Sequence, residues 1–443
     1  MNIKNLLNKK LFFSSVLLVL FLLIGFVVVI QTKPTHNLVI LFTHDLHSNL
    51  DDYTMPSDND NVVITGGYAR LYSAIENELK AKEDDTLVVD AGDFSMGTLF
   101  HTIRSTHSPE LITMGLMGYD VTTFGNHEFE FGSGHLAQAL LVAKKNNQGR
   151  LPAIVASNTV VDPQAASLET FRRAYAEYPV LPYTIIKRAG LKIGLFGLIG
   201  KDAAIYAPEA KPVIFSDPIE AARKAVEILR NKEKVDMVIC LSHSGTWADK
   251  SISEDEILAK EVPGIDVIIS GHTHSILDAF IRVGNTYIVA CGCYSRYLGR
   301  LVVARNSDGS FRAQDYKIMP ITSSLPKDPK ISSLIESYKK EIDKEYLFAF
   351  NYHYGQVLTE TAFSLTEPDW DNCFDRARCM TSGLGDLVTD AFVYAVKKVE
   401  SDNYRDISLT LEGFGQIRVP IAKGSITVND AMRLMALGIG PDD

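Results

Sequence analysis

A repeated order of segments constrains the fold of this chain most strongly: an apolar run, a polar loop rich in Gly, Asp, Asn or His, and then a helical stretch. Apolar runs of strand length are found at 37–42, 86–90, 117–122, 235–241 and 267–269. Strands that alternate with helices are typical of α/β proteins, whose ligands gather beyond the carboxyl ends of the strands. We therefore expect an α/β fold in which five polar loops meet at one site.

The five loops contain side chains with oxygen or imidazole donors suited to zinc or manganese. They are Asp45, His47, Asp93, Asn126, His243, His272 and His274. A single Asp at a strand end is usually a helix cap, and a single His is usually structural, but five such loops in series indicate a metal site. One tetrahedral ion cannot use all these donors, so we expect two ions about 3.5–4 Å apart, with Asp93 shared between them.

The loop Thr123–Glu130 also contains candidate catalytic groups. His127 can donate a proton to a reacting group or accept one from it. Glu130 follows three residues later, so one helical turn would bring its carboxylate within reach of the imidazole ring. His44 is ambiguous, because it adjoins Asp45 but would point away from it if the strand continued.

The N-terminal stretch predicts a membrane anchor. Lys4, Lys9 and Lys10 precede Leu11–Ile30, an uncharged stretch long enough to span the hydrocarbon core of a bilayer as a helix. No small-residue cleavage site closes this stretch, so we favour an uncleaved signal anchor over a cleaved signal peptide. The lysines would stay cytoplasmic and the chain from about Pro34 onward would lie outside the cell membrane, or would be secreted or periplasmic after cleavage.

Charge and cysteine content narrow the class of partner. The net charge of −10 argues against a nucleic acid polymer, which needs a basic surface, but allows a small phosphate ester bound by local cations. Cys240 is expected to be buried. Cys291 and Cys293 could form a metal or redox pair, or they could be two residues near a strand end without a chemical role. Cys373 and Cys379 could form a disulfide in an oxidising compartment. No feature of the sequence sets an oligomeric state.

A second unit is expected after a linking helix. Asp328–Tyr346 is charged, with apolar residues at helical spacing, and is typical of an interdomain helix. Beyond Asn351, Gly385–Phe392 predicts a helix with an apolar face, and Ser408–Leu411 predicts a strand. The chain therefore combines a large first unit with a smaller second one.

The five loops resemble the five sequence blocks of the metallophosphoesterase superfamily. The matching residues are Asp45-Leu46-His47, Gly92-Asp93, Gly125-Asn126-His127-Glu128, Ser242-His243 and Gly271-His272-Thr273-His274. Further stretches are similar to the 5′-nucleotidase and UDP-sugar hydrolase branch. They are Ala91–Gly97, Cys291–Tyr294, Leu298–Leu301 and Gly385–Ala391.

The resemblance implies a four-layered α/β metallophosphoesterase sandwich, with β-sheets flanked by helices, at 37–325. A cytoplasmic stub and anchor at 1–33 would precede it, and an interdomain helix at 326–348 would lead to a partial α/β substrate domain at 349–443. The resemblance also implies a metal-dependent phosphoric ester hydrolase with two divalent ions, which would be zinc, manganese or cobalt.

The resemblance assigns roles to individual residues. Asp45, His47, Asp93 and His274 would hold one ion, and Asp93, Asn126, His243 and His272 the other. His127 matches the family's catalytic histidine, and Glu130 stands where an aspartate usually orients that ring. Arg378 and Arg418 match substrate-binding arginines.

Three departures from the family bear on the substrate. Glu130 is one methylene longer than aspartate but can still accept a hydrogen bond from His127. Gly413 stands where relatives have an asparagine that contacts the nucleoside, and Leu437 stands where relatives have an aromatic ring that stacks on the base. The chain also stops at Asp443, short of the second domain that the resemblance implies, so we expect uncovered apolar faces there.

These observations favour release of phosphate from nucleotides by a 5′-nucleotidase-like enzyme on the outer face of the membrane. A UDP-sugar hydrolase, a 2′,3′-cyclic-nucleotide phosphodiesterase or a phosphatase for a non-nucleotide ester remains open, because Gly413 and Leu437 depart from the nucleotide pocket. A binding protein with a decayed site is disfavoured, because the donors and His127 are all present.

Overall fold

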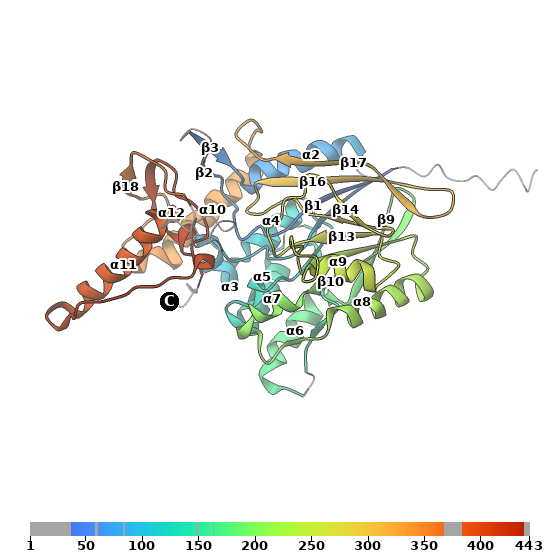
Figure 1. Ribbon diagram of the computed structural model, residues 1–443, viewed down its shortest axis with the longest axis horizontal. Coiled ribbons are helices and arrows are strands. Elements are labelled where there is room, and N and C mark those ends of the chain that lie inside the picture. The colour runs from blue at the N-terminus through green and yellow to red at the C-terminus, as the bar shows by residue number, and fades with distance from the viewer. Residues whose placement is uncertain are drawn as a thin grey trace, which may run out of the picture. The chain divides into compact units, whose positions relative to one another are not determined.

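The computed structural model describes residues 37–57, 61–82, 85–147, 149–162, 164–366 and 383–437. Residues 37–443 belong to one compact unit, and the predicted division of this stretch at 325 and 348 stays a prediction. Within the unit two large β-sheets face each other (Figure 1).

The first sheet has seven strands, and its central strands are parallel. In spatial order they are β17 (Phe311–Pro320), β16 (Tyr297–Arg305), β1 (Leu38–Thr43), β4 (Thr86–Asp90), β5 (Val121–Thr123), β6 (Ala153–Val155) and β8 (Val180–Leu181). β16 pairs antiparallel with both β1 and β17. The strands predicted at 37–42 and 86–90 are β1 and β4, whereas only the last two residues of the run at 117–122 lie in a strand, β5. The three strands are neighbours in one sheet.

The second sheet has six strands with a parallel centre. In spatial order they are β14 (Ile281–Val283), β15 (Thr286–Val289), β13 (Val267–Ser270), β12 (Met237–His243), β10 (Leu191–Ile199) and β9 (Tyr183–Arg188). The two edge strands β9 and β14 are antiparallel to their neighbours. β9 and β10 follow each other in the chain and form a hairpin.

Side-chain alternation along the strands builds a layered core. Leu38 and Ile40 of β1 pack with Ile193 of β10 in the apolar layer between the sheets. Val39 and Leu41 of the same strand face the opposite way, into a core shared with helices. Those helices are α2 (Tyr68–Lys82), α4 (Pro109–Leu116), α5 (Gly132–Asn146) and α10 (Pro329–Glu345).

The second sheet is covered on its outer side by α8 (Pro218–Glu227) and α9 (Glu254–Glu261). The order helix, sheet, sheet, helix confirms the predicted α/β fold with flanked sheets (Figure 1). Smaller elements are α3 (Arg104–His107), α6 (Glu169–Glu177), α7 (Lys201–Ile205), β2 (Tyr53–Pro56), β3 (Val62–Thr65), β7 (Thr159–Val160) and β11 (Ile214–Phe215).

Helix α10 matches the predicted linking helix in extent. Asp328 caps its start by accepting a hydrogen bond from the backbone N–H of Ile331. Ile335, Tyr338 and Ile342 are buried in the core that also contains α2 and α4. Because its apolar face is buried there, α10 packs in the same core as α2 and α4.

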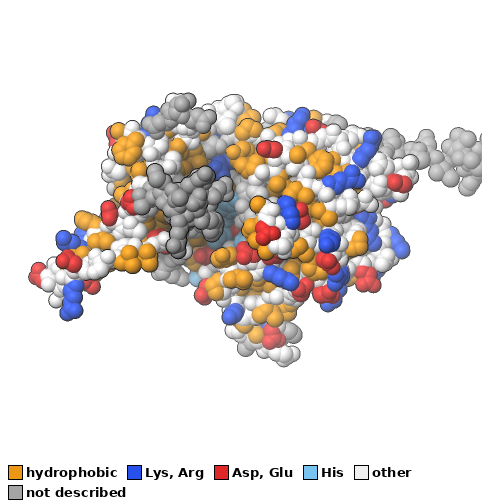
Figure 2. Space-filling model, in the orientation of Figure 1, with side chains coloured by type: hydrophobic (Ala, Val, Ile, Leu, Met, Phe, Trp, Pro, Cys, Tyr) orange, Lys and Arg blue, Asp and Glu red, His pale blue; other side chains and the backbone are white. Residues whose placement is uncertain are grey.

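The segment after α10 contains β18 (Val357–Thr361), α11 (Gly383–Glu400), β19 (Gly424–Thr427) and α12 (Val428–Leu434). The strand predicted at Ser408–Leu411 is wrong: these residues are irregular, and the Leu409 and Leu411 side chains are exposed. An apolar pattern forms a strand only where another strand pairs with it, and none pairs here among the described residues. Hydrophobic side chains are also exposed along α11 (Figure 2).

Several predictions fall outside the described residues. They concern the anchor at Leu11–Ile30, the pair Cys373 and Cys379, and Arg378. Across the described part of the chain, no helix combines the length and the apolar character needed to cross a membrane. Cys240, Cys291 and Cys293 are buried free thiols, as expected for Cys240.

Candidate functional site

The carboxyl ends of five strands converge on the candidate site, because parallel strands end at the same edge of a sheet. β1, β4 and β5 end at Thr43, Asp90 and Thr123, and their loops carry four of the predicted ligands. In the second sheet, His243 is the last residue of β12, whereas the prediction ended that strand at Leu241. His272 and His274 follow β13.

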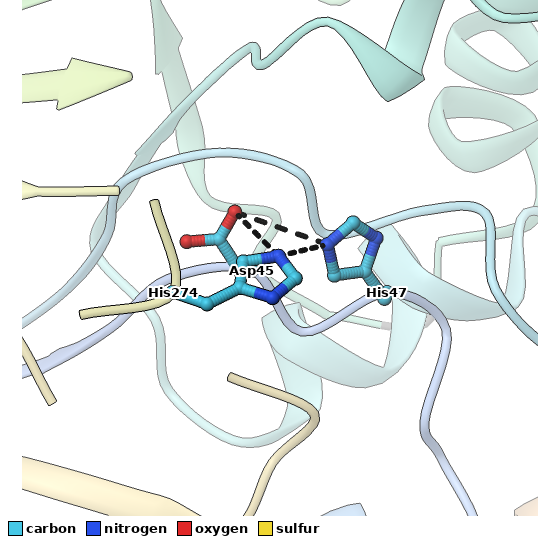
Figure 3. Close-up of side chains that lie close together, drawn as sticks. All are labelled: Asp45, His47 and His274. Carbon is cyan, nitrogen blue, oxygen red and sulfur yellow. Dashed lines mark hydrogen bonds and ion pairs between the residues drawn. The ribbon is translucent and has the colours of Figure 1, made fainter. Parts of the chain in front are cut away.

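The first donor group consists of Asp45, His47 and His274, whose side chains point toward one another (Figure 3). The His47 and His274 Nε2 atoms are 3.0 Å apart. The Asp45 Oδ1 atom lies 3.8 Å from the first of these nitrogens and 3.6 Å from the second. Three donors this close, aimed at a common point, are what one metal ion requires.

The second donor group consists of Asp93, His243 and His272. The His243 Nε2 atom is 2.9 Å from the Asp93 Oδ2 atom and 3.2 Å from the amide oxygen of Asn126. The structure therefore brings Asn126 to this group, as the sequence predicts. The opposite ring nitrogen, Nδ1 of His243, donates to the Ala91 carbonyl at 2.9 Å, which leaves Nε2 free to bind a metal.

Asp93 connects the two groups. Its Oδ2 atom is 4.0 Å from the His47 Nε2 atom, and Asp93, His47 and His127 together form a third group of close donors. The backbone N–H of His127 donates to the Asp93 Oδ1 atom at 2.9 Å. Asp93 is therefore the one carboxylate among the described residues that belongs to a group with His47 and to a group with His243.

The electrostatics of the cluster suit a cation. Burial lowers the pKa of His47 well below its ordinary value and that of His274 to about 3, so both rings are neutral and have a free lone pair. Burial alone would lower the pKa of His243 as well, but the Asp93 carboxylate raises it to about 10. A divalent ion would replace that proton, and the donors present therefore fit a metal.

Backbone strain is concentrated at the same residues. Asp45, His47, Asp93, His272 and His274 all have positive φ angles, between 49° and 74°, which non-glycine residues rarely adopt. Such conformations persist only where surrounding contacts hold them, and they are concentrated at functional sites.

One glycine permits the close approach of the loops. A Cβ atom on Gly125 would lie 2.1 Å from the Asp93 Oδ1 atom and 2.7 Å from the His243 ring. Both distances are far below van der Waals contact, so only glycine allows Asn126 to sit beside these two side chains.

His127 and Glu130 form the predicted pair beside the donor groups. The His127 Nδ1 atom is 2.7 Å from the Glu130 Oε2 atom, and the pair lies in a short 3-10 turn and the residue after it. The ring of His127 is 5.1 Å from that of His47. With Nδ1 held by the carboxylate, Nε2 is the nitrogen left for a substrate.

A cavity of about 1000 Å³ lies over the donor groups. Its lining includes Asp93, His127 and Glu130, and also Arg418 and Leu437 of the C-terminal segment. The positive charge of Arg418 contributes to the low pKa values of His47 and His274, after the larger effect of burial. Arg418 thus lies near the donors, whereas Arg378 lies outside the described residues.

The sequence did not predict the roles of two residues at the site, Glu128 and Arg296. Glu128 accepts hydrogen bonds from the backbone N–H groups of Asp93, Gly125 and Ser95, and so ties two ligand loops together. Its position directly after His127, in a loop that also contains Glu130, was the available signal. Arg296 lines the cavity as a second cation, next to the Cys293 thiol.

The orientation of His44 also differs from the one considered for a continuing strand. β1 ends at Thr43, so the alternation of side chains stops before His44. Asp45 has a φ of 52°, and the His44 Nδ1 atom lies 2.5 Å from the Asp45 Oδ2 atom. The two adjacent side chains therefore point toward each other.

The model of the calcineurin-like phosphoesterase family matches residues 38–275, which include all seven predicted ligands. The trifunctional nucleotide phosphoesterase of Bacillus subtilis is 28% identical over 422 residues, and the match covers 91% of this chain and 26% of that protein. The human 5′-nucleotidase is 25% identical over 431 residues, and the match covers 90% of this chain and 68% of that one. The chain thus spans about a quarter of the first relative and about two thirds of the second.

Solved structures show the same fold. The 5′-nucleotidase precursor from Thermus thermophilus aligns with a TM-score of 0.72 at 24% identity, over 91% of this chain and 74% of that one. The Haemophilus influenzae NAD nucleotidase aligns with a TM-score of 0.56 at 22% identity, over 70% of this chain and 68% of that one.

Proposed function

Because this chain belongs to the calcineurin-like phosphoesterase family, a family of metal-dependent phosphoester hydrolases, we propose that it uses two divalent ions to release phosphate from nucleotides. The observation that supports the proposal most directly is the position of Asp93 between two groups of metal donors at the floor of one cavity. Zinc, manganese and cobalt all suit these oxygen and imidazole donors. A small phosphate ester, rather than a nucleic acid polymer, is the proposed partner.

Asp45, His47, Asp93 and His274 would hold one ion, and Asp93, Asn126, His243 and His272 would hold the other. When bound, the two ions supply Lewis-acid polarisation of the phosphoryl group.

His127 provides the proton chemistry in this proposal. Glu130 accepts a hydrogen bond from Nδ1–H of His127, so the ring is held with Nε2 directed to the substrate. From there Nε2 can stabilise charge on the phosphoryl oxygens or protonate the leaving oxygen. Arg418, which lines the same cavity, binds the anionic part of the substrate.

A second substrate class is favoured by one observation. Leu437 lines the cavity at the position where the family resemblance implies an aromatic ring. Stacking of a base on an aromatic side chain contributes about 1–3 kcal/mol, much of which leucine would not supply. A UDP-sugar, a cyclic nucleotide or a non-nucleotide phosphate ester is therefore the alternative substrate.

The location is part of the same proposal. The stretch Leu11–Ile30 would hold the catalytic residues on the outer face of the cell membrane, and cleavage after it would instead release them. The lysines that precede this stretch support that orientation, because positively charged flanks stay on the cytoplasmic side.

Phosphate release from four substrates tests the function: AMP, UDP-glucose, a 2′,3′-cyclic nucleotide and p-nitrophenyl phosphate. The protein is stripped with a chelator and assayed before and after addition of manganese or zinc. We expect metal-dependent release from AMP, and a loss of about 10²–10⁴-fold in kcat for His127→Ala. The exposed His353→Ala is the matched control.

The outcomes separate the alternatives. Release from p-nitrophenyl phosphate alone would point to a non-nucleotide ester, and release from UDP-glucose or the cyclic nucleotide would point to the corresponding hydrolase. Turnover of His127→Ala within a few-fold of wild type would contradict the role given to His127. No metal-dependent release from any substrate would overturn the proposal.

A further inference from the structure

We propose that His44 is a positioning residue, which holds the Asp45 carboxylate so that one of its oxygens faces the metal donors. The inference rests on the proposed function, since it concerns the same metal site. His44 and Asp45 are both buried, with no side-chain exposure.

The partners of the His44 ring determine its tautomer. Its Nε2 atom accepts a hydrogen bond from the backbone N–H of Cys291 at 2.8 Å. A backbone N–H can only donate, so Nε2 has no proton and the ring proton is on Nδ1. Nδ1 lies 2.5 Å from the Asp45 Oδ2 atom, and therefore donates to the carboxylate. His44 thus links a backbone amide to a metal-site carboxylate.

This link leaves the second oxygen of Asp45 for the metal. Oδ2 accepts a hydrogen bond from Nδ1 of His44. The backbone N–H of His272 donates to both carboxylate oxygens, at 3.0 Å to Oδ2 and at 3.2 Å to Oδ1. Oδ1 faces the ring nitrogens of the site, at 3.6 Å from Nε2 of His274 and 3.9 Å from Nε2 of His243. Because His44 donates to one oxygen, a rotation of the carboxylate away from this orientation would break that hydrogen bond and turn the other oxygen away from the ring nitrogens.

The link also joins the two sheets. Asp45 follows β1 of the first sheet, whereas Cys291 follows β15 of the second. Asp45 has a φ of 52°, and such a conformation needs surrounding contacts to hold it. His44 provides one of these contacts directly at the side chain that would bind the ion.

Asp202 plays the corresponding part for His272. The Asp202 Oδ2 atom is 2.9 Å from the His272 Nε2 atom, so Nδ1 is the ring nitrogen left for the group with Asp93 and His243. Metal-binding histidines commonly donate their other ring N–H to a carboxylate, which fixes the ring and increases its basicity. Asp202 is 41% exposed, so its substitution tests the same principle outside the core.

Two substitutions separate the two hydrogen bonds of His44. In His44→Asn the amide nitrogen takes the place of Nδ1 and keeps the contact with Asp45. In His44→Gln the longer side chain reaches the place of Nε2 and keeps the contact with Cys291. We expect His44→Gln to weaken metal binding by about 10–100-fold, and His44→Asn to stay within a few-fold of wild type.

The measurement is calorimetric titration of the full chain, stripped with a chelator, with manganese or zinc alone. The melting temperature of the metal-free protein is measured alongside, because a structural role would lower it without a selective effect on metal affinity. Asp202→Ala should weaken binding by about tenfold, and Asp202→Asn by less, since an amide oxygen can still accept the His272 proton. Asp249→Ala, an exposed position, is the control.

Equal losses in His44→Asn and His44→Gln, or unchanged metal affinity in both, would overturn the proposal. If neither variant folds, or if only the metal-free melting temperature falls, His44 is a structural residue and the proposal is likewise wrong. A wild-type chain that binds the ions tightly but hydrolyses no phosphate ester would instead refute the proposed function. The affinities of the variants would still decide the role of His44.

Discussion

The donor groups and the C-terminal segment differ in how firmly the fold holds their side chains. Asp45, Asp93 and His243 are almost fully buried, and each is held by several hydrogen bonds or ion pairs. In the C-terminal segment, the side chain of Arg418 makes a hydrogen bond only at 3.4 Å, to the Gly415 carbonyl, among the contacts of the described residues. The apolar core of that segment is correspondingly small. It consists of Leu384, Val388, Ile417, Ile421 and Leu434.

The difference separates chemistry from substrate selection. The buried donors are already in the arrangement that the reaction needs, so no free energy is spent on reorganising them when a substrate enters. The loosely held groups of the C-terminal segment contribute binding energy that a few substitutions can change. We therefore expect substitutions in the first region to abolish turnover, and substitutions in the second to change which ester is hydrolysed.

The largest effect is expected for Asp93→Ala, which removes the carboxylate common to the donor groups. Several kcal/mol of transition-state stabilisation depend on the bound ions, so kcat should fall by about 10³-fold or more. Elemental analysis should show loss of bound metal, and steady-state assays the loss of turnover. The exposed Asp249→Ala should retain both. A variant that kept two bound ions and a tenth of the activity would show that turnover does not depend on the Asp93 carboxylate.

The next effect concerns the stability of the C-terminal segment alone. Leu384 is fully buried in the small core, so Leu384→Ala should cost about 2–4 kcal/mol there. Hydrogen exchange should become faster in α11 and α12 while the protection of β1, β4 and β12 is unchanged. Leu411→Ala, at a position that is 78% exposed, should change stability by less than about 0.5 kcal/mol. Equal loss of protection in both regions would show that they unfold together.

The same division explains how far the sequence could predict the structure. The apolar runs and their polar loops are local patterns, and parallel strands must bring their carboxyl ends to one edge, so the donor groups were predictable. The contact of His44 with Cys291 and that of Asp202 with His272 join residues far apart in the chain. No local pattern encodes such pairs, and both were missed.

The C-terminal segment was harder to predict for a second reason. Strand patterns predict a strand only when a partner strand is present, and Ser408–Leu411 has the pattern without the partner. Helix α11, in contrast, has a helical period along its own length and was predicted in part from Gly385–Phe392. The strand at Ser408–Leu411 was therefore misplaced because the local pattern does not show whether a partner strand is present.

Arg418→Ala tests whether the second region acts on binding rather than chemistry. A hydrogen bond to a charged group contributes about 1.5–3 kcal/mol, so KM for AMP should rise about 10–100-fold while kcat changes little. Steady-state kinetics with AMP and p-nitrophenyl phosphate measure this difference, and the exposed Arg312→Ala is the control. A fall in kcat with an unchanged KM would instead assign Arg418 to the transition state.

The smallest effect is a pH dependence of stability that originates in Glu110 of α4, whose partner Ser48 directly follows the predicted ligand His47. Burial raises the pKa of Glu110, which accepts a hydrogen bond from Ser48, from 4.5 to about 7. Between these values the unfolded chain loses the proton while the folded chain keeps it, so this group lowers the stability of the fold as the pH rises.

Glu110→Gln removes that titration. The variant should lose less stability than wild type between pH 5 and pH 8, by about 1–3 kcal/mol, because an amide has no proton to release in this range. Urea unfolding of the metal-free protein at several pH values measures the difference, with the exposed Glu169→Gln as the matched control. Parallel pH curves for Glu110→Gln and wild type would mean that Glu110 is ionised in the folded protein. The first region would then stabilise a buried charge next to Ser48 without a metal, and its preorganisation would extend beyond the donor groups.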